Sequence, residues 1–462
     1  MKKKLLLVSV VDKKYYPGEK CFNPNPAIKA WQPVQLGIIA ALTPEDWDIE
    51  IIDENYEDFK YTEAGLVGIS AYTTSVYRAY QIAQEYKGKN IPVVLGGYHA
   101  TFFPEEASQY VDVVAVGRAE GVWPDILKDF ESKSLQPLYT CDTKIPAFFK
   151  QRKDIFKKYD YPIGTVMASL GCPYNCDFCA GPVVQNHHYY LRDIDETVEE
   201  IKQLEQDYFI FSDDNFIGSS NAHKDRVVML LQKMIEQKVN KKWQCAATIN
   251  VSQYPDLLKL AHKAGCVLMY IGIESYDENE LLMYNKSSNE KFFVNNYKKA
   301  FREIHKNKIA IFGGYLCGTE NDNLEDYMRK AKAIIRSSVD SYTFTFVTPL
   351  PKTKLFTDYL LKGKLLYTSF PEDWIYYNCY CATVKLKNGN EVEHHSAYNE
   401  AMIKLYSMPV LINKFIRAFM HIRSVHTTIH VYTILKCVHN NDSASVFLKI
   451  MYRFFEIKKK KT

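Results

Sequence analysis

Three cysteines lie close together in the segment GCPYNCDFCAGP at residues 171–182. Cys172, Cys176 and Cys179 have the spacing C-x3-C-x2-C and directly follow an apolar run. Thiolates are the ligands of iron–sulfur clusters, and three of them on a compact loop can bind three irons of a cubane and leave the fourth iron open. The spacing therefore predicts a four-iron, four-sulfur cluster that keeps one open coordination position.

A zinc site and a set of merely packed thiols are the two alternatives for this segment. A closed structural zinc site has four protein ligands, and no fourth cysteine follows at short range. A zinc ribbon also needs a second C-x2-C pair, which the sequence lacks. We favour the cluster because the cysteine spacing, the preceding apolar run and the pattern of the following strands agree with one another.

Six apolar runs alternate with helical patterns from about residue 161 onward. Six βα units of this kind resemble an incomplete version of the eightfold (β/α) barrel. The runs lie at 164–170, 208–214, 243–249, 266–275, 309–318 and 341–347. We therefore expect a partial (β/α)6 TIM-like barrel, with its active site at the carboxyl ends of the strands.

Polar side chains follow three of these predicted strands at their carboxyl ends. They are Asp213 and Asp214 after the second strand, Glu274 and Ser275 after the fourth, and Thr348 after the sixth. Asp213 and Asp214 also suit helix capping at a strand-to-helix turn, so a structural role is an open alternative for them. Glu274 ends a strongly apolar strand, and its carboxylate therefore needs a partner.

The first 130 residues contain an earlier alternating series. Its apolar runs lie at 4–10, 47–53, 65–71, 92–97 and 111–117. Near-continuous apolar runs separated by crossover segments indicate an α/β domain with a doubly wound, Rossmann-like parallel sheet. Neither GxGxxG nor GxxxxGK[ST] occurs, so the common nucleotide-binding motifs are absent.

Composition and charge divide the chain further. We expect a first domain at 1–131, a polar linker at 132–160, the barrel at 161–385 and a helical region at 386–462. Residues 401–462 contain 11 Lys and Arg against two acidic residues, a net charge of +9, whereas the whole chain carries +4.

The start of the chain is interpreted as a buried strand rather than a signal peptide, because its apolar run is short. Most other cysteines lie singly in apolar runs, which favours a reducing cytoplasm.

Together these motifs resemble the radical S-adenosylmethionine enzymes, in the subclass that has an amino-terminal cobalamin-binding-like domain. The resemblance covers about residues 1–385. It implies that the three cysteines bind the cluster and that the open iron binds the methionine part of S-adenosylmethionine. Reduction of the sulfonium would then give a deoxyadenosyl radical. Phe178 would shield the cluster beside Cys179.

Four further segments correspond to parts of the family's S-adenosylmethionine site. FSDDNF (211–216), with Asp213 and Asp214, would meet the methionine end of the cofactor. IGIES (271–275), with Glu274 and Ser275, would meet the ribose. GGYLCGTE (313–320) contains Gly314 and has its acid one position early. TPLPKT (348–353) places Thr348 near the adenine and has Lys352 where the family has glycine.

The amino-terminal domain resembles the cobalamin-binding domains of this subclass. The matching stretches lie at 31–44, 51–55, 68–75, 96–107 and 116–124. The DxHxxG motif, whose histidine ligates cobalt in many cobalamin proteins, is absent. The resemblance implies a base-off corrin held by loop backbone and small residues, at Ser70, Thr73, Gly96, Gly97 and Gly117. His99 is a further candidate, although a local hydrogen bond on a loop is the simpler interpretation of it. A cofactor-free domain is the alternative.

This resemblance implies a cobalamin-dependent radical methyltransferase that acts on an unactivated carbon. A non-methylating radical cyclisation or rearrangement, and a non-catalytic iron–sulfur sensor, are the alternatives. We expect a small-molecule or lipid-like substrate and an external electron donor of the flavodoxin or ferredoxin type. No nucleic acid is expected.

The basic tail has one amphipathic stretch, at residues 413–439. Its large apolar residues are Phe415, Ile416, Phe419, Ile422 and Ile429. Three of them, at 415, 419 and 422, share one helical face, and Lys414, Arg417 and Arg423 lie off it. We favour a helix packed on the barrel with a solvated charged face. The alternative is peripheral binding to the inner face of an anionic membrane, assisted by Lys458 to Lys461.

Overall fold

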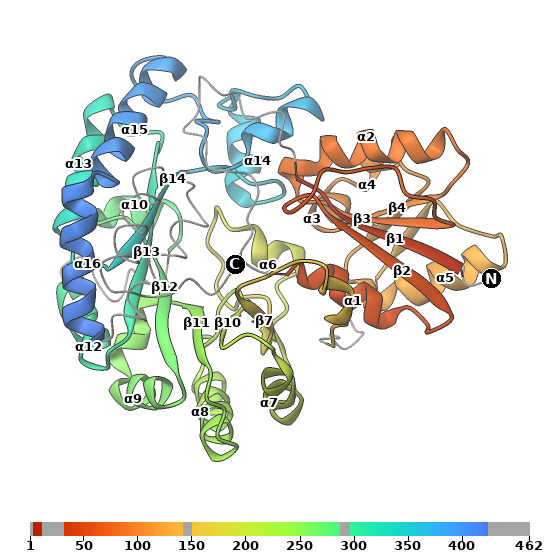
Figure 1. Ribbon diagram of the computed structural model, residues 1–462. Coiled ribbons are helices and arrows are strands. Elements are labelled where there is room, and N and C mark those ends of the chain that lie inside the picture. Colours follow the sequence, from red (N-terminus) through yellow and green to blue (C-terminus); the bar gives the residue numbers. More distant parts are fainter. Residues whose placement is uncertain (1–2, 12–31, 142–149, 287–295, 424–462) are drawn as a thin grey trace.

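The computed structural model of this chain describes residues 3–11, 32–141, 150–286 and 296–423. Figure 1 shows two α/β units side by side, each built on its own parallel sheet. The expected classes, a doubly wound sheet and a partial barrel followed by helices, are both confirmed.

The first sheet has six parallel strands in the order β2-β1-β3-β4-β5-β6. They are β1 (Lys3–Ser9), β2 (Trp47–Asp53), β3 (Leu66–Ser70), β4 (Val93–Gly96), β5 (Val113–Val116) and β6 (Leu138–Thr140). The strand order reverses between β1 and β3. A sheet of this kind binds its ligand in the crevice at the carboxyl ends of the strands beside such a switch point.

Helices cover both faces of the first sheet because successive strand residues point to opposite sides. Leu5 and Leu7 of β1 pack with α1 and α5, and Leu6 and Val8 pack with α2. The helices are α1 (Val34–Leu42), α2 (Val76–Lys87), α3 (Tyr98–Phe102), α4 (Pro104–Ala107) and α5 (Trp123–Glu131). Two short 3-10 helices, Thr73–Ser75 and Ala119–Gly121, complete the unit.

Strand β6 lies inside the segment that the sequence suggests as a linker, so this segment is not wholly a connection. Tyr139 turns inward and is buried, while Leu138 is 51% exposed. The Tyr139 hydroxyl donates to Asp129 Oδ2 of α5 at 2.7 Å. One inward residue and one helix contact suffice for an edge strand, but they leave no apolar run to recognise.

The second sheet is also parallel, in the order β14-β13-β12-β11-β10-β7. Its strands are β7 (Gly164–Val166), β10 (Tyr208–Phe211), β11 (Lys242–Ala247), β12 (Cys266–Glu274), β13 (Ala310–Cys317) and β14 (Ser341–Phe346). Its two edge strands are the first and the last, so the barrel is open on one side, as predicted. The expected strand 164–170 is divided, because β8 (Ser169–Leu170) pairs instead with β9 (Tyr190–Leu191) in an antiparallel ladder.

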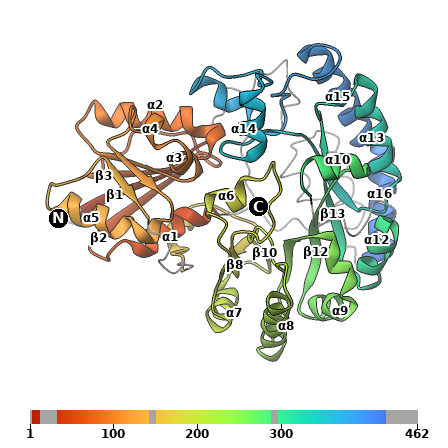
Figure 2. The ribbon, with the colours of Figure 1, turned by 180° about the vertical axis from the view of Figure 1, so that it is seen from behind.

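Most helices of this unit lie on the outer face of the open barrel (Figure 2), whereas its first helix and the helix after β14 lie toward the first unit. The helices are α6 (Ala180–Val184), α7 (Ile194–Gln203), α8 (Asn221–Glu236), α9 (Pro255–Lys263), α10 (Glu278–Met283), α12 (Tyr297–Lys306), α13 (Leu324–Arg336), α14 (Lys354–Leu361), α15 (Glu391–Leu405) and α16 (Met408–Ile422). The described residues of this unit also form short 3-10 helices at Asp154–Phe156, Ile249–Gln253 and Glu372–Tyr376. In the described residues, no helix has the length and apolar character needed to cross a bilayer.

Helix α16 packs on the barrel, and one of its lysines corrects an expectation from the sequence. Lys414 was expected on a solvated face, but it is buried, and its Nζ donates to the carbonyls of Ile334, Ser337 and Val339 at 2.9–3.0 Å. Carbonyls at the end of a helix lack intrahelical partners, so a buried ammonium can bind them. Burial lowers the pKa of Lys414 to about 7.

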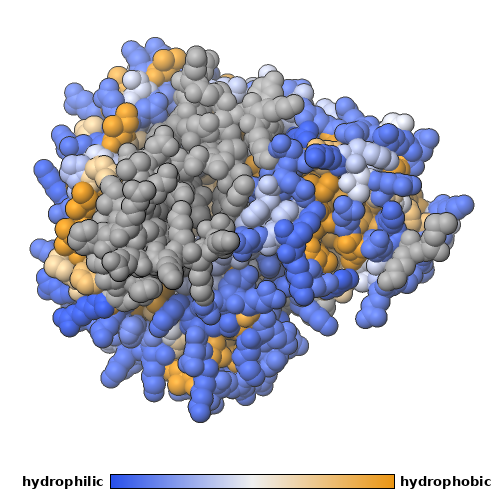
Figure 3. Space-filling view, viewed as in Figure 1, coloured by the Kyte–Doolittle hydropathy of each residue, from blue (hydrophilic) through white to orange (hydrophobic). Residues whose placement is uncertain are grey.

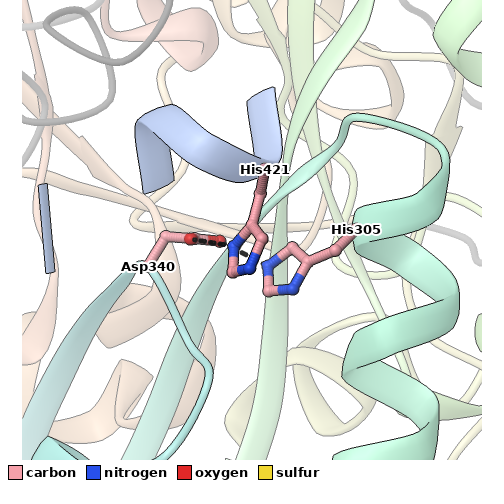
Figure 4. Close-up of side chains that lie close together, drawn as sticks. All are labelled: His305, Asp340 and His421. Atoms are coloured by element: carbon pink, nitrogen blue, oxygen red, sulfur yellow. Dashed lines mark hydrogen bonds and ion pairs between the residues drawn. The ribbon is translucent and has the colours of Figure 1, made fainter. Parts of the chain in front are cut away.

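A second anchor joins α16 to the amino ends of the strands. His305 Nε2 lies 2.8 Å and His421 Nδ1 lies 3.3 Å from the two carboxylate oxygens of Asp340 (Figure 4). The imidazole rings stack at 3.7 Å, and Ile311 donates its backbone N–H to the same carboxylate. The three side chains could ligate a metal ion, but the carboxylate is already satisfied and Lys414 lies nearby. We therefore interpret them as a hydrogen-bonded anchor.

Candidate active site

The cysteine loop begins at a turn that only glycine can form without strain. Gly171 has φ +89°, and a Cβ there would lie 2.2 Å from the carbonyl oxygen of His188. The carboxylate of Asp214 accepts a hydrogen bond from the Gly171 N–H. Strand β10 therefore holds the start of the loop in place through Asp214.

The three cysteine thiols are free and partly exposed. The Cys179 N–H donates to the Cys176 carbonyl at 3.0 Å, which closes the loop. Asn215 Nδ2 approaches Cys172 Sγ at 3.9 Å. Burial raises the pKa of all three thiols, that of Cys179 to about 12, so binding of a metal must displace protons from them.

The donor set of the loop fits a cluster better than a single zinc ion. A closed structural zinc site has four protein ligands, whereas the loop supplies three thiols. A cubane accepts each of three thiolates on a different iron and leaves the fourth iron open.

Asp213 and Asp214 fold the end of β10 onto the cysteine loop. The buried Asp213 carboxylate accepts from the Ala168 N–H at 3.0 Å and from the Ser169 hydroxyl. Burial raises its pKa to about 6 against those hydrogen bonds. Neither aspartate caps α8, because Ser220 does. Asp213 thus links the end of β10 to residues 168 and 169 by hydrogen bonds, whereas Asp214 is exposed beside the loop.

Glu274 pairs with a lysine that nothing in the sequence pattern indicates. Lys286 Nζ lies 2.7 Å from Glu274 Oε1, and both side chains are nearly buried. Gly272 makes room for the pair, since a Cβ there would lie 2.4 Å from the carboxylate and 2.9 Å from the ammonium. Burial lowers the pKa of Lys286, but Glu274 and the Cys176 thiolate raise it by more. Lys286 therefore stays charged beside the cysteines.

Two other predicted residues, Phe178 and Ser275, lie around this pair. Phe178 packs edge-on against Tyr284 at 6.0 Å, and Lys286 Nζ lies 5.8 Å from the Phe178 ring centre. Ser275 is buried, and its hydroxyl donates to Glu280 at 2.6 Å. Phe178, Glu274, Ser275 and Lys286 surround one narrow gap that has no room for a water molecule. The structure thus brings these predicted residues into one place.

Gly314 and Thr348 lie further along the strand ends. A Cβ at Gly314 would meet the Tyr270 hydroxyl at 2.4 Å, so glycine gives that ring its position. Thr348 is buried, and its hydroxyl donates to the Phe346 carbonyl at 3.3 Å. Lys352 has φ +60°, the backbone region that glycine favours. Lysine thus keeps the backbone that glycine would adopt at this position.

The residues proposed to contact cobalamin cluster at the carboxyl edge of the first sheet. Gly97 and Gly117 both have positive φ, and a Cβ on Gly97 would lie 2.7 Å from the Ala71 carbonyl. Ser70 and Gly96 end neighbouring strands, and Thr73 is buried just beyond β3. A ligand bound at this edge would therefore meet the backbone of these residues.

His99 is not on a loop, which corrects the expectation from the sequence. It lies in α3 with a fully buried side chain. Its Nε2 is 2.9 Å from Glu106 Oε1 and 3.2 Å from the Tyr80 hydroxyl. This nitrogen already has partners inside the domain, so cobalt ligation by it would break both contacts.

The edge of the first sheet faces the cysteine loop. Figures 1 and 2 both show α3 beside α6, the helix that follows Cys179. Burial raises the pKa of Tyr98, and the Asp214 and Cys179 charges raise it further. Tyr72, next to the same edge, is 58% exposed and its ring contacts that of Tyr98 at 5.5 Å. The two candidate cofactor sites thus adjoin each other.

Both units match known family models. Residues 166–331 match the Radical SAM superfamily, and residues 29–127 match the B12 binding domain. The chain is 28% identical over 368 residues to the bacteriochlorophyllide d C-12(1)-methyltransferase of Chlorobaculum tepidum, covering 75% of this chain and 76% of that one. It is 25% identical over 360 residues to the hopanoid C-2 methylase of Rhodopseudomonas palustris, covering 74% and 66%.

A solved structure has the same arrangement of elements. The cobalamin-dependent S-adenosylmethionine radical enzyme OxsB, with aqua-cobalamin and S-adenosylmethionine bound, superposes with a TM-score of 0.65. The match covers 98% of this chain and 75% of that one at 11% identity. At this identity the likeness shows the fold.

Proposed function

We propose that this protein, which belongs to the radical S-adenosylmethionine superfamily and carries an amino-terminal B12-binding domain, transfers methyl groups to an unactivated carbon. Two relatives whose names state methylation span about three quarters of the chain. The single observation that carries the proposal is the position of Asp214. Its carboxylate accepts a hydrogen bond from the Gly171 N–H at the start of the cysteine loop, and its charge raises the pKa of Tyr98 at the edge of the first sheet.

The residues of this chain fit the three cofactors that its two families use. Cys172, Cys176 and Cys179 would hold the four-iron, four-sulfur cluster, and the backbone near Gly97 and Gly117 would hold the corrin. The cluster supplies an electron for cleavage of S-adenosylmethionine, and cobalamin supplies a methyl carrier.

The binding of S-adenosylmethionine is assigned to one group of residues. This group comprises Phe178, Asp213, Asp214, Glu274, Ser275, Gly314 and Thr348. The facing surfaces of the two units would exclude water around the reacting groups. Asp213, which is fully engaged within the protein, would act by holding the loop.

Product analysis tests the proposal and separates it from its alternatives. Anaerobically reconstituted, reduced protein should convert S-adenosylmethionine to both 5′-deoxyadenosine and S-adenosylhomocysteine when cobalamin is present. Deoxyadenosine without S-adenosylhomocysteine would indicate a non-methylating radical enzyme. Neither product would indicate a sensor.

A spectroscopic prediction follows from the engaged state of His99. Because Nε2 of His99 is bonded to Glu106 and Tyr80, we expect bound cobalamin in the base-off form without a protein nitrogen on cobalt. Absorption and electron paramagnetic resonance of cob(II)alamin in the protein would report this. A nitrogen hyperfine pattern that disappears in His99→Ala would contradict the expectation.

A small-molecule substrate, an external electron donor of the flavodoxin or ferredoxin type and a cytoplasmic location complete the proposal. More specifically, we propose a lipid-like substrate. One of the relatives named above is a hopanoid methylase. The division of the chain at about residues 131, 160 and 385 is proposed with it, with β6 assigned to the first unit.

Peripheral membrane contact would suit a lipid-like substrate. Four large apolar side chains of α16 remain exposed, and Figure 3 shows apolar colour at the edge of the molecule where α16 runs. They are Ile412, Ile416, Phe419 and Met420. Phe415 and Ile422, which share a helical face with Phe419, are buried against the barrel, as the favoured interpretation of this helix predicts. Ile429 and Lys458 to Lys461 lie outside the described residues.

Vesicle binding tests this contact. We expect the full chain to sediment with anionic vesicles at low salt and to lose most of that binding in Ile416→Glu. Ile403→Glu is the matched control, because Ile403 is 70% exposed on the neighbouring helix α15. Equal sedimentation of the two variants would remove the support for a membrane role of α16.

A further inference from the structure

A short segment that follows the barrel strands returns to contact the first unit. The 3-10 helix Glu372–Tyr376 lies against the 3-10 helix Thr73–Ser75 and against α2. Trp374 is only 1% exposed, and its ring lies 4.8 Å from that of Phe103. The ring of Phe370, from the barrel unit, stacks on this indole at 3.6 Å. The indole is thus enclosed between side chains of two different units.

One carboxylate of the first unit receives hydrogen bonds from both units. Trp374 Nε1 donates to Glu106 Oε2 at 3.0 Å. The other carboxylate oxygen accepts from the Tyr80 hydroxyl and from His99 Nε2, both at 2.9 Å. Tyr80 and His99 therefore orient Glu106, and Trp374 is the donor that reaches it from the barrel unit.

The charge on Glu106 strengthens these contacts. Burial raises its pKa, but the hydrogen bonds from His99 and Trp374 lower it by more, so the carboxylate stays ionised. Hydrogen bonds to an ionised acceptor are stronger than those between neutral groups. An ionised carboxylate can only accept hydrogen bonds, so the proton of the His99 ring lies on Nε2, which faces Glu106. The other ring nitrogen, Nδ1, is buried and has no partner in the described part of the chain.

We propose that Glu106 and Trp374 form an interdomain latch, which fixes the distance between the carboxyl edge of the first sheet and the cysteine loop. Lys352, which follows β14, adds a second contact, because its Nζ lies 5.2 Å from the Phe103 ring centre. The purpose of the latch rests on the proposed function, since a methyl carrier and a cluster in separate units must be held in register. The latch itself is independent of any cofactor. Its members are positioning residues.

Hydrogen exchange in the full-length chain without cofactors tests the latch. Trp374→Phe keeps an aromatic ring and removes the N–H donor. We expect amide exchange at Glu372–Tyr376 and Thr73–Ser75 to accelerate by about tenfold, the size typical of a lost charge-assisted bond. Trp123→Phe is the matched control, because buried Trp123 loses a 2.9 Å bond to Thr43 within the first unit. Its exchange at those two helices should stay as in the wild type.

A second variant distinguishes loss of the latch from misfolding of the Trp374→Phe protein. Glu106→Gln cannot accept from all three donors, and it should accelerate exchange at the same two helices while β12 remains protected. Thermal denaturation of every variant separates global from local loosening. If Trp374→Phe and Trp123→Phe lower the melting temperature alike and neither changes exchange at Glu372–Tyr376, Trp374 is a packing residue and the latch is refuted. Because no cofactor or turnover enters the measurement, this failure would leave the proposed function untouched.

Discussion

Replacement of Cys176 by alanine is expected to abolish both the iron content and the formation of 5′-deoxyadenosine. Wild-type protein reconstituted under anaerobic conditions should bind about four irons per chain through three thiolates. Two thiolates on the loop cannot hold three corners of a cubane. Iron analysis and chromatography of the reaction products measure the two losses, which should both approach completeness.

Cys141→Ala is the control for this experiment. Cys141 is a buried cysteine of the first unit, so its loss removes a thiol without touching the loop. We expect full iron content and unchanged deoxyadenosine formation in this variant. Retention of a four-iron cluster in Cys176→Ala would refute the assignment of the three cysteines.

The strands of both units could be predicted because burial on both faces leaves a continuous apolar run. The run at 65–71, for example, contains all of β3, and the first four residues of that strand are buried. β6 escaped prediction because one inward tyrosine is too little to form a pattern. The break between β7 and β8 escaped because it depends on pairing with β9, which lies some twenty residues later in the chain.

The candidate site could be predicted where chemistry is local in sequence and not where it depends on folding. The cysteines lie within eight residues of one another, and their spacing alone indicates a cluster. Lys286 lies in a segment without a motif, and the one signal for it was indirect. A carboxylate at Glu274 that ends an apolar strand needs a cation, but the sequence does not say which one.

Buried polar side chains of the helices were misjudged for a related reason. Lys414 was expected on a solvated face, and His99 was expected on a loop with a local hydrogen bond. Lys414 is buried because its ammonium binds carbonyls at the end of α13, which lie far from it in sequence. His99 does have a local partner, the Glu106 carboxylate, but it is buried because its segment forms the helix α3. Helical periodicity describes which face is apolar, but it does not identify unsatisfied carbonyls on a neighbouring helix.

Replacement of Lys286 by methionine is expected to damage both stability and the redox properties of the site. Removing one partner of a nearly buried ion pair leaves Glu274 uncompensated, which costs about 3–5 kcal/mol in the free energy of unfolding. The Lys286 ammonium also lowers the pKa of the Cys172 and Cys176 thiols. Loss of a cation beside an anionic cluster should make its reduction potential more negative, by on the order of tens of millivolts.

A double variant separates the two effects of Lys286. In Glu274→Gln/Lys286→Met the uncompensated charge is gone, so denaturant titration should show recovery of most of the lost stability. The reduction potential, followed by electron paramagnetic resonance during redox titration, should stay below that of the wild type, because the cation is still missing. Lys286→Arg keeps the charge and should keep a potential near the wild-type value. If the double variant regains the wild-type potential together with stability, Lys286 serves only to neutralise Glu274 and has no electrostatic role at the cluster.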